Sequence, residues 1–110
     1  MSSQIYLDFN ATAPTRPEVI DAMTEAMRDG GNASSVHGTG RAARARVEAA
    51  RRAVAALIGA RAENVLFVGS GTEANNQVLR CTGCTDLVIS AIEHESVMLA
   101  RSDAAVLPVL

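Results

Sequence analysis

The alternation of strand-like and helix-like segments in the second half of the chain constrains its fold most. Short apolar runs at residues 64–68, 86–91 and 105–107 have the composition of buried strands. Residues 72–80 and 96–101 separate these runs and are predicted to be helices. Strands that alternate with helices favour an α/β fold with a mostly parallel sheet. Three short strands cannot cover such a sheet, so we expect the chain to be a fragment or to depend on a missing partner segment.

The first part of the chain contains one helix pattern between two irregular segments. Residues 5–9 alternate apolar and polar side chains and could form a short strand. Thr15 and Glu18 have the spacing of a capping box, in which each side chain binds the backbone N–H of the other residue. A helix should therefore begin there and run to about Arg28, where two consecutive glycines end it.

A longer helix is expected from about Thr39 to Ile58, after a polar loop at residues 32–38. Its apolar residues fall on one side at helical spacing, and arginines occupy the other side. Gly59 is predicted to end this helix.

The charge pattern argues against a nucleic-acid partner. The formal net charge is −2, and the ten basic residues are all arginine, with no lysine in the chain. The arginines between Arg41 and Arg52 are interleaved with Glu48, which fits a solvated helix face better than a polyanion site. There is no signal-peptide pattern and no apolar run of bilayer length, so we expect a cytoplasmic protein without a membrane partner.

The glycine-rich turn at residues 69–71 is the segment most suggestive of ligand chemistry. It joins a predicted strand to a predicted helix, and the first N–H groups of a helix have no intrahelical partner. Such groups form an anion site that suits a phosphate, and the Thr72 hydroxyl adds a donor. The alternative is an ordinary tight turn capped by Ser70 or Thr72. The turn is neither a Walker loop nor a dinucleotide fingerprint.

Cys81 and Cys84 form a single C-x-x-C pair. This spacing can serve a redox couple or half of a zinc site. Because no second pair exists, two thiols in a helix-to-strand turn are the favoured interpretation, and no metal site is predicted.

Four segments resemble, in the same order, the motifs of cysteine desulfurases and related class V aminotransferases. They are YLDFNATAP (residues 6–14), GNASSVH (31–37), GSGTEANN (69–76) and SAIEHESV (90–97). The resemblance implies the N-terminal part of the large domain of a fold-type I pyridoxal-phosphate enzyme. Within residues 1–110, residues 1–38 would be an N-terminal arm, helix and loop, and residues 39–110 would begin the cofactor-binding α/β domain.

The resemblance also implies roles for individual residues. Gly71, where alanine is common in the family, and Thr72 would hold the phosphate of pyridoxal 5′-phosphate. His94 would lie against the pyridine ring and assist proton transfers in a complete enzyme. A histidine after a strand is more often structural, but the surrounding motif favours the cofactor role here. Residues 32–37 would shape a loop beside the site. Three residues would lie near its mouth on the substrate side: Asn10, Ala11 and Thr12.

The implied reaction is that of a cysteine desulfurase, which converts L-cysteine to L-alanine and leaves persulfide sulfur on the enzyme. A class V aminotransferase and a selenocysteine lyase are alternatives within the family. The resemblance further implies a small amino-acid substrate and a homodimeric parent enzyme.

The missing lysine limits what this chain can do by itself. Pyridoxal-phosphate enzymes bind their cofactor covalently through a lysine amine, and this sequence contains none. In the family, the lysine, an acidic partner of the pyridine nitrogen and the attacking cysteine all come from later sequence. The isolated chain is therefore predicted to be inactive. Outside this enzyme class, a non-catalytic binding module and a small redox or metal protein using Cys81 and Cys84 remain open.

Overall fold

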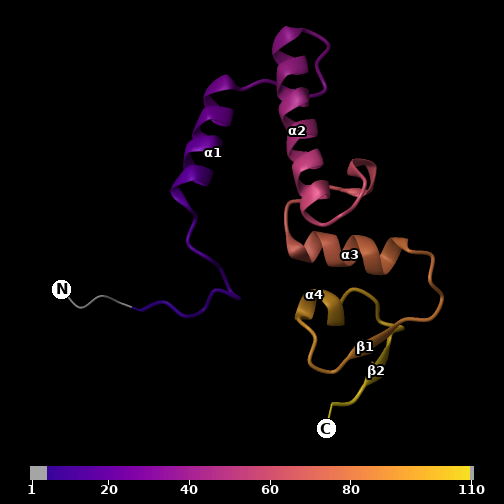
Figure 1. The fold of residues 1–110 in the computed structure, drawn as a ribbon. Coiled ribbons are helices and arrows are strands. Elements are labelled where there is room, and N and C mark those ends of the chain that lie inside the picture. The colour runs from indigo at the N-terminus through magenta and orange to yellow at the C-terminus, as the bar shows by residue number, and fades with distance from the viewer. Residues whose placement is uncertain (1–4, 110) are drawn as a thin grey trace. The chain divides into compact units, whose positions relative to one another are not determined.

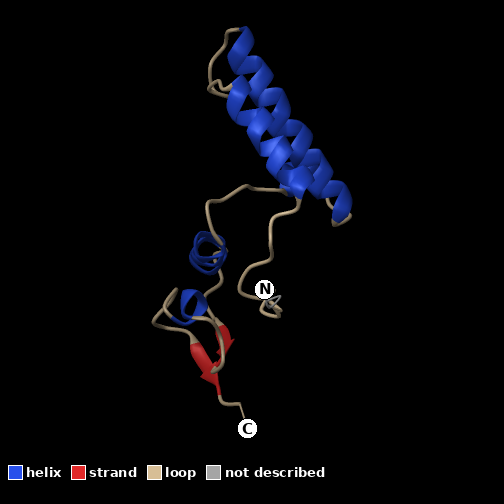
Figure 2. Cartoon of the chain, turned by 90° about the vertical axis from the view of Figure 1, so that its left-hand side faces the viewer, coloured by secondary structure: helices blue, strands red, loops and turns tan. Residues whose placement is uncertain are grey.

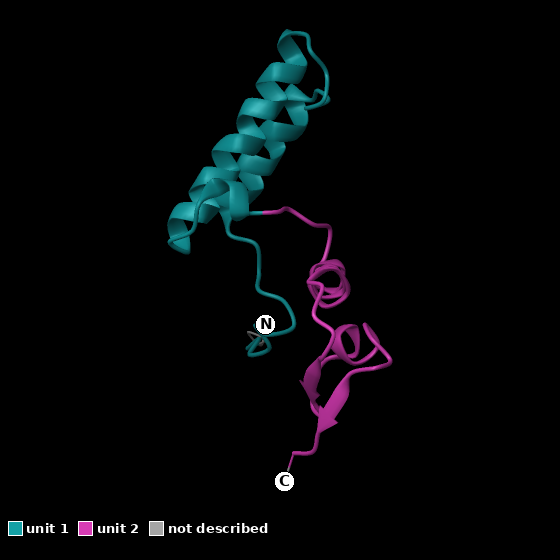
Figure 3. Cartoon of the chain, turned by 90° about the vertical axis from the view of Figure 1, so that its right-hand side faces the viewer, with its two compact units in different colours: residues 1–65 teal, residues 66–110 magenta. Residues whose placement is uncertain are grey.

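The chain divides into two compact units, with the boundary between Val65 and Leu66 (Figure 3). A computed structural model describes residues 5–109 (Figure 1). The first unit holds helices α1 (Pro17–Asp29) and α2 (Gly38–Leu57) and the 3-10 turn η1 (Ala62–Asn64). The second holds α3 (Gly71–Cys81), β1 (Val88–Ser90), α4 (Glu95–Met98) and β2 (Ala105–Leu107). These helices with a small parallel sheet confirm the predicted α/β class.

Helix α1 begins at Pro17 and ends at Asp29, with Gly30 as its C-cap residue, close to the predicted bounds. The predicted capping box is wrong, because Arg16 is the N-cap residue and no side chain caps this end. Proline restricts the residue before it to extended backbone, and Arg16 accordingly has φ −67° and ψ 147°. Thr15 therefore lies one residue too early to cap the helix. At the other end, Gly30 has φ +62°, a conformation that favours glycine.

Helix α2 begins under a tightly folded loop. The His37 ring caps it, with Nδ1 accepting a hydrogen bond from the Gly40 N–H at 3.4 Å. Gly40 is buried, and a Cβ built there would lie 2.4 Å from the Ser35 carbonyl oxygen. Only a residue without a side chain allows this contact. The helix ends beside Gly59, which has φ +66°, as the sequence predicted.

Ion pairs connect the two long helices of the first unit, which run in opposite directions (Figure 1). Arg46 of α2 pairs with Asp29 and, at 3.7 Å, with Glu25, both on α1. Most apolar side chains of α1 remain exposed, and Ala55 of α2 is buried. Charged contacts rather than a continuous apolar core therefore join α1 to α2.

Two predicted strands are absent from the described residues. Residues 5–9 instead lead into a turn, where the Tyr6 hydroxyl lies 2.7 Å from the Asp8 carbonyl oxygen and 2.9 Å from that of Thr12. Residues 65–68 form no strand in the part of the chain that the structure describes, and the Arg51 guanidinium binds the Val65 carbonyl. An apolar pattern favours extended backbone but cannot supply the neighbouring strand that a ladder needs. Both strand predictions were wrong for this reason.

The second unit contains the parallel sheet, drawn as red arrows in Figure 2. Val88 of β1 pairs with Ala105 of β2, and Ser90 pairs with Leu107. Strand β1 is shorter than predicted, whereas β2 has the predicted bounds. Helix α4 connects the strands and packs against α3. The small core of this unit includes Ile89 and Ala100.

No helix among residues 5–109 has both the length and the apolarity needed to cross a membrane. The predicted division at residue 38 separates two segments by their expected roles, whereas the compact units are defined by contacts within the chain. The units therefore do not test this division. It stays a prediction.

Candidate functional site

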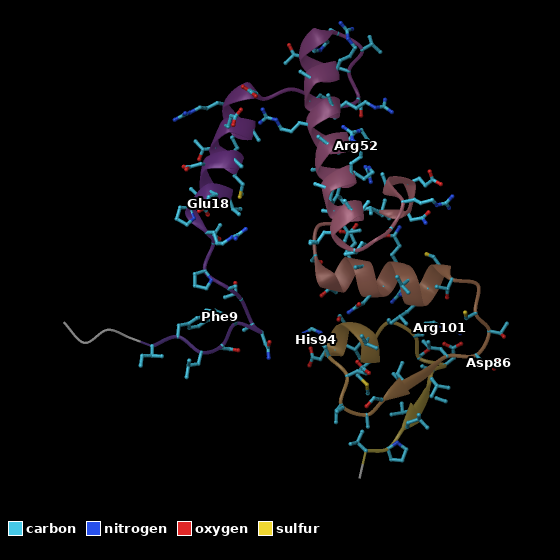
Figure 4. All side chains as sticks on the ribbon, in the orientation of Figure 1. Phe9, Glu18, Arg52, Asp86, His94 and Arg101 are labelled. Carbon is cyan, nitrogen blue, oxygen red and sulfur yellow. The ribbon has the colours of Figure 1, made fainter. Side chains whose placement is uncertain are left out.

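A pocket of about 360 Å³ lies between α3 and α4 in the second unit. It brings together Thr72 and His94, which are 22 positions apart and which the sequence singled out for the same ligand. Figure 4 shows His94 where α4 begins. The lining residues are Thr72, Asn76, Arg80, His94, Glu95, Ser96 and Leu99.

The N-terminus of α3 is capped on one side and open on the other. The Ser70 hydroxyl accepts a hydrogen bond from the Glu73 N–H at 3.1 Å, and the Glu73 carboxylate accepts one from the Gly69 N–H at 2.7 Å. Within residues 5–109, the N–H groups of Gly71 and Thr72 make no hydrogen bond. Ser70 therefore caps the helix, while two N–H groups remain without a partner among residues 5–109. The phosphate interpretation of the turn stays a prediction.

Gly71 has open space at the position that a side chain would take. A Cβ built on Gly71 would meet no atom within 4 Å, and its φ is not positive. Neither backbone strain nor crowding within the chain therefore requires glycine here. The free N–H groups, the Thr72 hydroxyl and the positive end of the helix dipole together suit a phosphate.

The His94 ring is fixed by its own helix. His94 is the N-cap residue of α4, and its Nδ1 accepts a hydrogen bond from the Ser96 N–H at 3.1 Å. The Ser96 hydroxyl lies 2.9 Å from the same nitrogen. Asn75 of α3 donates to that hydroxyl from Nδ2 at 2.9 Å. The network ties the ring to the helix whose N-terminus is open.

Sequence reasoning missed Asn75 and Ser96, although both lie inside the matched motifs. Ser96 is only 8% exposed, and its hydroxyl is hydrogen-bonded on both sides. The spacing of His94 and Ser96 is the one short-range signal that could have suggested their contact. The contact with Asn75 joins residues 21 positions apart, so no local pattern predicts it.

Asn10, Ala11 and Thr12 belong to the first unit, whereas the pocket belongs to the second. They lie in a turn in which the N–H groups of Ala11 and Thr12 donate to the Asp8 carbonyl at 3.2 and 3.4 Å. Their role near the mouth of the site stays a prediction.

The loop at residues 32–37 is closed by its own hydrogen bonds. The Asn32 side-chain oxygen accepts from the Ser34 N–H, and the Asn32 carbonyl accepts from the Ser35 N–H, each at 2.9 Å. These bonds give the loop a defined shape. Its predicted place beside the site is not tested by them.

Cys81 and Cys84 are exposed free thiols on either side of the turn that follows α3. Arg101 fixes this turn by donating to the Cys84 carbonyl at 2.7 Å and the Thr85 carbonyl at 3.2 Å. Arg101 also pairs with Asp103 at 2.5 Å, which lowers the pKa of that carboxyl and raises the pKa of the guanidinium. Among residues 5–109, no group of three or more His, Cys, Asp or Glu side chains is arranged to hold a metal ion.

Comparison with known proteins extends over nearly the whole chain. The sequence model of the family Aminotransferase class-V matches residues 5–107. The chain is 48% identical over 80 residues to a selenocysteine lyase of Bos taurus, an alignment that covers 72% of the chain and 18% of the lyase. It is 44% identical over 106 residues to a cysteine desulfurase of Rhodobacter capsulatus, covering 90% of the chain and 28% of that enzyme. The chain thus spans 18% to 28% of the length of these curated relatives.

Proposed function

Because the chain belongs to the class V aminotransferase family, we propose that its second unit holds the phosphate of pyridoxal 5′-phosphate in an enzyme of the cysteine desulfurase kind. One observation carries the proposal: a single pocket is lined both by Thr72, in the first turn of α3, and by His94. The four motifs noted in the sequence all lie within the matched residues. Cysteine desulfurases among the relatives support this reaction over transamination.

The donors at the start of α3 fit the phosphate end of this cofactor. The N–H groups of Gly71 and Thr72 and the Thr72 hydroxyl would bind the phosphate oxygens. His94, fixed by Ser96, would lie against the ring and hold a proton near the substrate. When bound, the cofactor supplies an electron sink for bond cleavage at the substrate. The substrate would be a small amino acid, and the whole enzyme a homodimer.

The chain has no residue that could hold the cofactor covalently in the manner of this class. None of its 110 residues is a lysine. We therefore infer that the chain alone binds the cofactor through its phosphate and performs no desulfurase reaction. With L-cysteine and pyridoxal 5′-phosphate, the chain should release no more alanine than the cofactor alone does.

Selenocysteine lyase is the second candidate, because selenocysteine lyases match the chain at up to 48% identity. Both reactions would use the same phosphate site, so residues 69–76 do not distinguish them. In the whole protein, kcat/KM for L-cysteine and for L-selenocysteine would decide. A preference of more than about a hundredfold for the selenium substrate would favour the lyase.

A phosphate-dependent binding experiment tests the proposal. The ¹⁵N-labelled chain is titrated with pyridoxine 5′-phosphate and, as the matched control, with pyridoxine, which lacks the phosphate. Neither compound carries the reactive aldehyde, so no covalent adduct with an amine can form. Only the phosphate ester should shift the Gly71 and Thr72 amide signals. Equal responses to both compounds, or no response at these amides, would overturn the proposal.

A further inference from the structure

Three side chains form a continuous hydrogen-bonded chain from α3 to the pocket. Asn75 Nδ2 donates to Ser96 Oγ at 2.9 Å, and Ser96 Oγ lies 2.9 Å from His94 Nδ1. Ser96 is the buried polar residue in the middle, with 8% of its surface exposed. Its hydroxyl therefore exchanges these two bonds with water far less readily than an exposed serine would.

The backbone fixes which nitrogen of the imidazole carries the proton. The Ser96 N–H is always a donor, and it points at His94 Nδ1 from 3.1 Å. Nδ1 must therefore be an acceptor, so the neutral ring carries its proton on Nε2. The Asn75 amide adds to this effect. Because its N–H donates to Ser96 Oγ, the single hydroxyl proton of Ser96 is left to donate to Nδ1.

We propose that Asn75 and Ser96 are positioning residues that hold the His94 ring as its Nε2–H tautomer. The inference rests on the proposed function, in which His94 lies beside the cofactor. It sharpens that role, since the nitrogen left for a ligand is then a hydrogen-bond donor. His94 would donate from Nε2–H before it could act as a base, as a neutral imidazole does where it polarises a substrate.

The charge environment of the ring requires a matched control. Arg80 of α3 and Glu95 of α4 line the same pocket, and Glu93 precedes His94 in the chain. A new carboxylate near the ring would change its protonation by charge alone. Asn76 provides the control, because it lies beside Asn75, lines the pocket and donates to the Thr72 carbonyl rather than to Ser96.

The test uses the ¹⁵N-labelled chain at a pH where the His94 ring is neutral, and it measures the ratio of Nε2–H to Nδ1–H from the ring ¹⁵N shifts. The chain has 2 histidines, so a His37→Gln variant assigns the two sets of ring signals. Asn75→Asp keeps the shape but replaces a donor by an acceptor, which turns the Ser96 hydroxyl proton away from His94. The loss of one hydrogen bond, about 1 kcal/mol, should lower the ratio about fivefold.

Two comparisons distinguish an effect that passes through the Ser96 hydroxyl from an effect of the added negative charge alone. Asn76→Asp should leave the ratio unchanged, and Asn75→Asp should have no effect in a Ser96→Ala background. Ser96→Ala alone should lower the ratio, whereas Ser96→Thr, which keeps a hydroxyl, should preserve it. If both aspartate variants change the ratio equally, or if Ser96→Ala leaves it unchanged, the proposal is overturned.

No cofactor takes part in this measurement, so it stands apart from the test of the proposed function. A normal tautomer response with no phosphate-dependent shift at Gly71 and Thr72 would refute the phosphate site alone. A phosphate-dependent shift without the tautomer response would refute the positioning role alone.

Discussion

At the residue scale, two glycines of α2 provide the sharpest contrast in the chain. Gly40 faces the Ser35 carbonyl, and a Cβ there would lie 2.4 Å from that oxygen, whereas a Cβ on Gly38 would meet nothing within 4 Å. We expect Gly40→Ala to destabilise the first unit by about 1–3 kcal/mol, because the loop must move away. Gly38→Ala is the matched control and should not destabilise it. Urea unfolding followed by circular dichroism would measure both, and similar midpoints would contradict this account.

Gly71 should accept a side chain that Gly40 cannot. Its built Cβ has open space, and its backbone is already helical at the start of α3. Gly71→Ala should therefore stabilise α3 by roughly 0.4–1 kcal/mol, because alanine has fewer unfolded conformations to lose. The substitution keeps the backbone N–H, so the phosphate-dependent amide shift should persist. Thermal unfolding tests the first expectation, and a lower melting temperature would show that the space is needed.

The Asp103 carboxyl should make the second unit sensitive to acid. Its hydrogen bond with Arg101 lowers its pKa below the ordinary 3.8. A carboxyl with a lowered folded-state pKa contributes stability above its unfolded pKa, and that contribution is lost as pH falls through the folded value. Stability should therefore fall as the solution is acidified below about pH 4, and Asp103→Asn should reduce this dependence. Glu93→Gln, which removes a carboxylate without an ion pair among residues 5–109, should preserve it when unfolding is followed against pH.

At the scale of the element, the cap of α3 stabilises the helix and also limits which groups stay free. Ser70 Oγ binds the Glu73 N–H at 3.1 Å. Ser70→Ala should destabilise the second unit by about 1 kcal/mol, the usual cost of losing such a cap. Ser70→Asp keeps an acceptor and should restore most of the loss, as measured by amide hydrogen exchange in α3. If α3 is protected equally in Ser70→Ala and in the unchanged chain, the Ser70 hydroxyl contributes nothing to its stability.

Local signals predicted most elements well, and the failures have identifiable causes. Glycines with positive φ end α1 and α2 where the sequence placed those ends. The capping box at Thr15 failed because Pro17 moved the N-cap to Arg16. Residues 5–9 and 64–68 failed as strands because pairing depends on a neighbour that no local pattern specifies.

At the scale of the whole molecule, apolar surface dominates the expected behaviour. Within residues 5–109, the buried apolar residues are Ala55, Ile89 and Ala100, while Val88 and Leu107 of the sheet are 56% and 60% exposed. A short parallel sheet with uncovered apolar faces is a template for association. The 110-residue chain should therefore self-associate as its concentration rises. Leu107→Lys should reduce the association. Gln77→Lys, which introduces the same residue at an exposed polar position, should not. Sedimentation velocity over a concentration series would distinguish them, and a monodisperse monomer throughout would contradict the expectation.

The sequence by itself determined the helix ends at Gly30 and Gly59, the glycine-rich turn before α3, the family, and the absence of a lysine. These features depend on backbone freedom and composition, which act over a few residues. Only the tertiary structure decided that β1 pairs with β2, that Thr72 and His94 line one pocket, and that Asn75 reaches Ser96. Each of these contacts joins residues at least 17 positions apart. Such contacts depend on the path of the whole chain through β1 and α4, which no local pattern specifies.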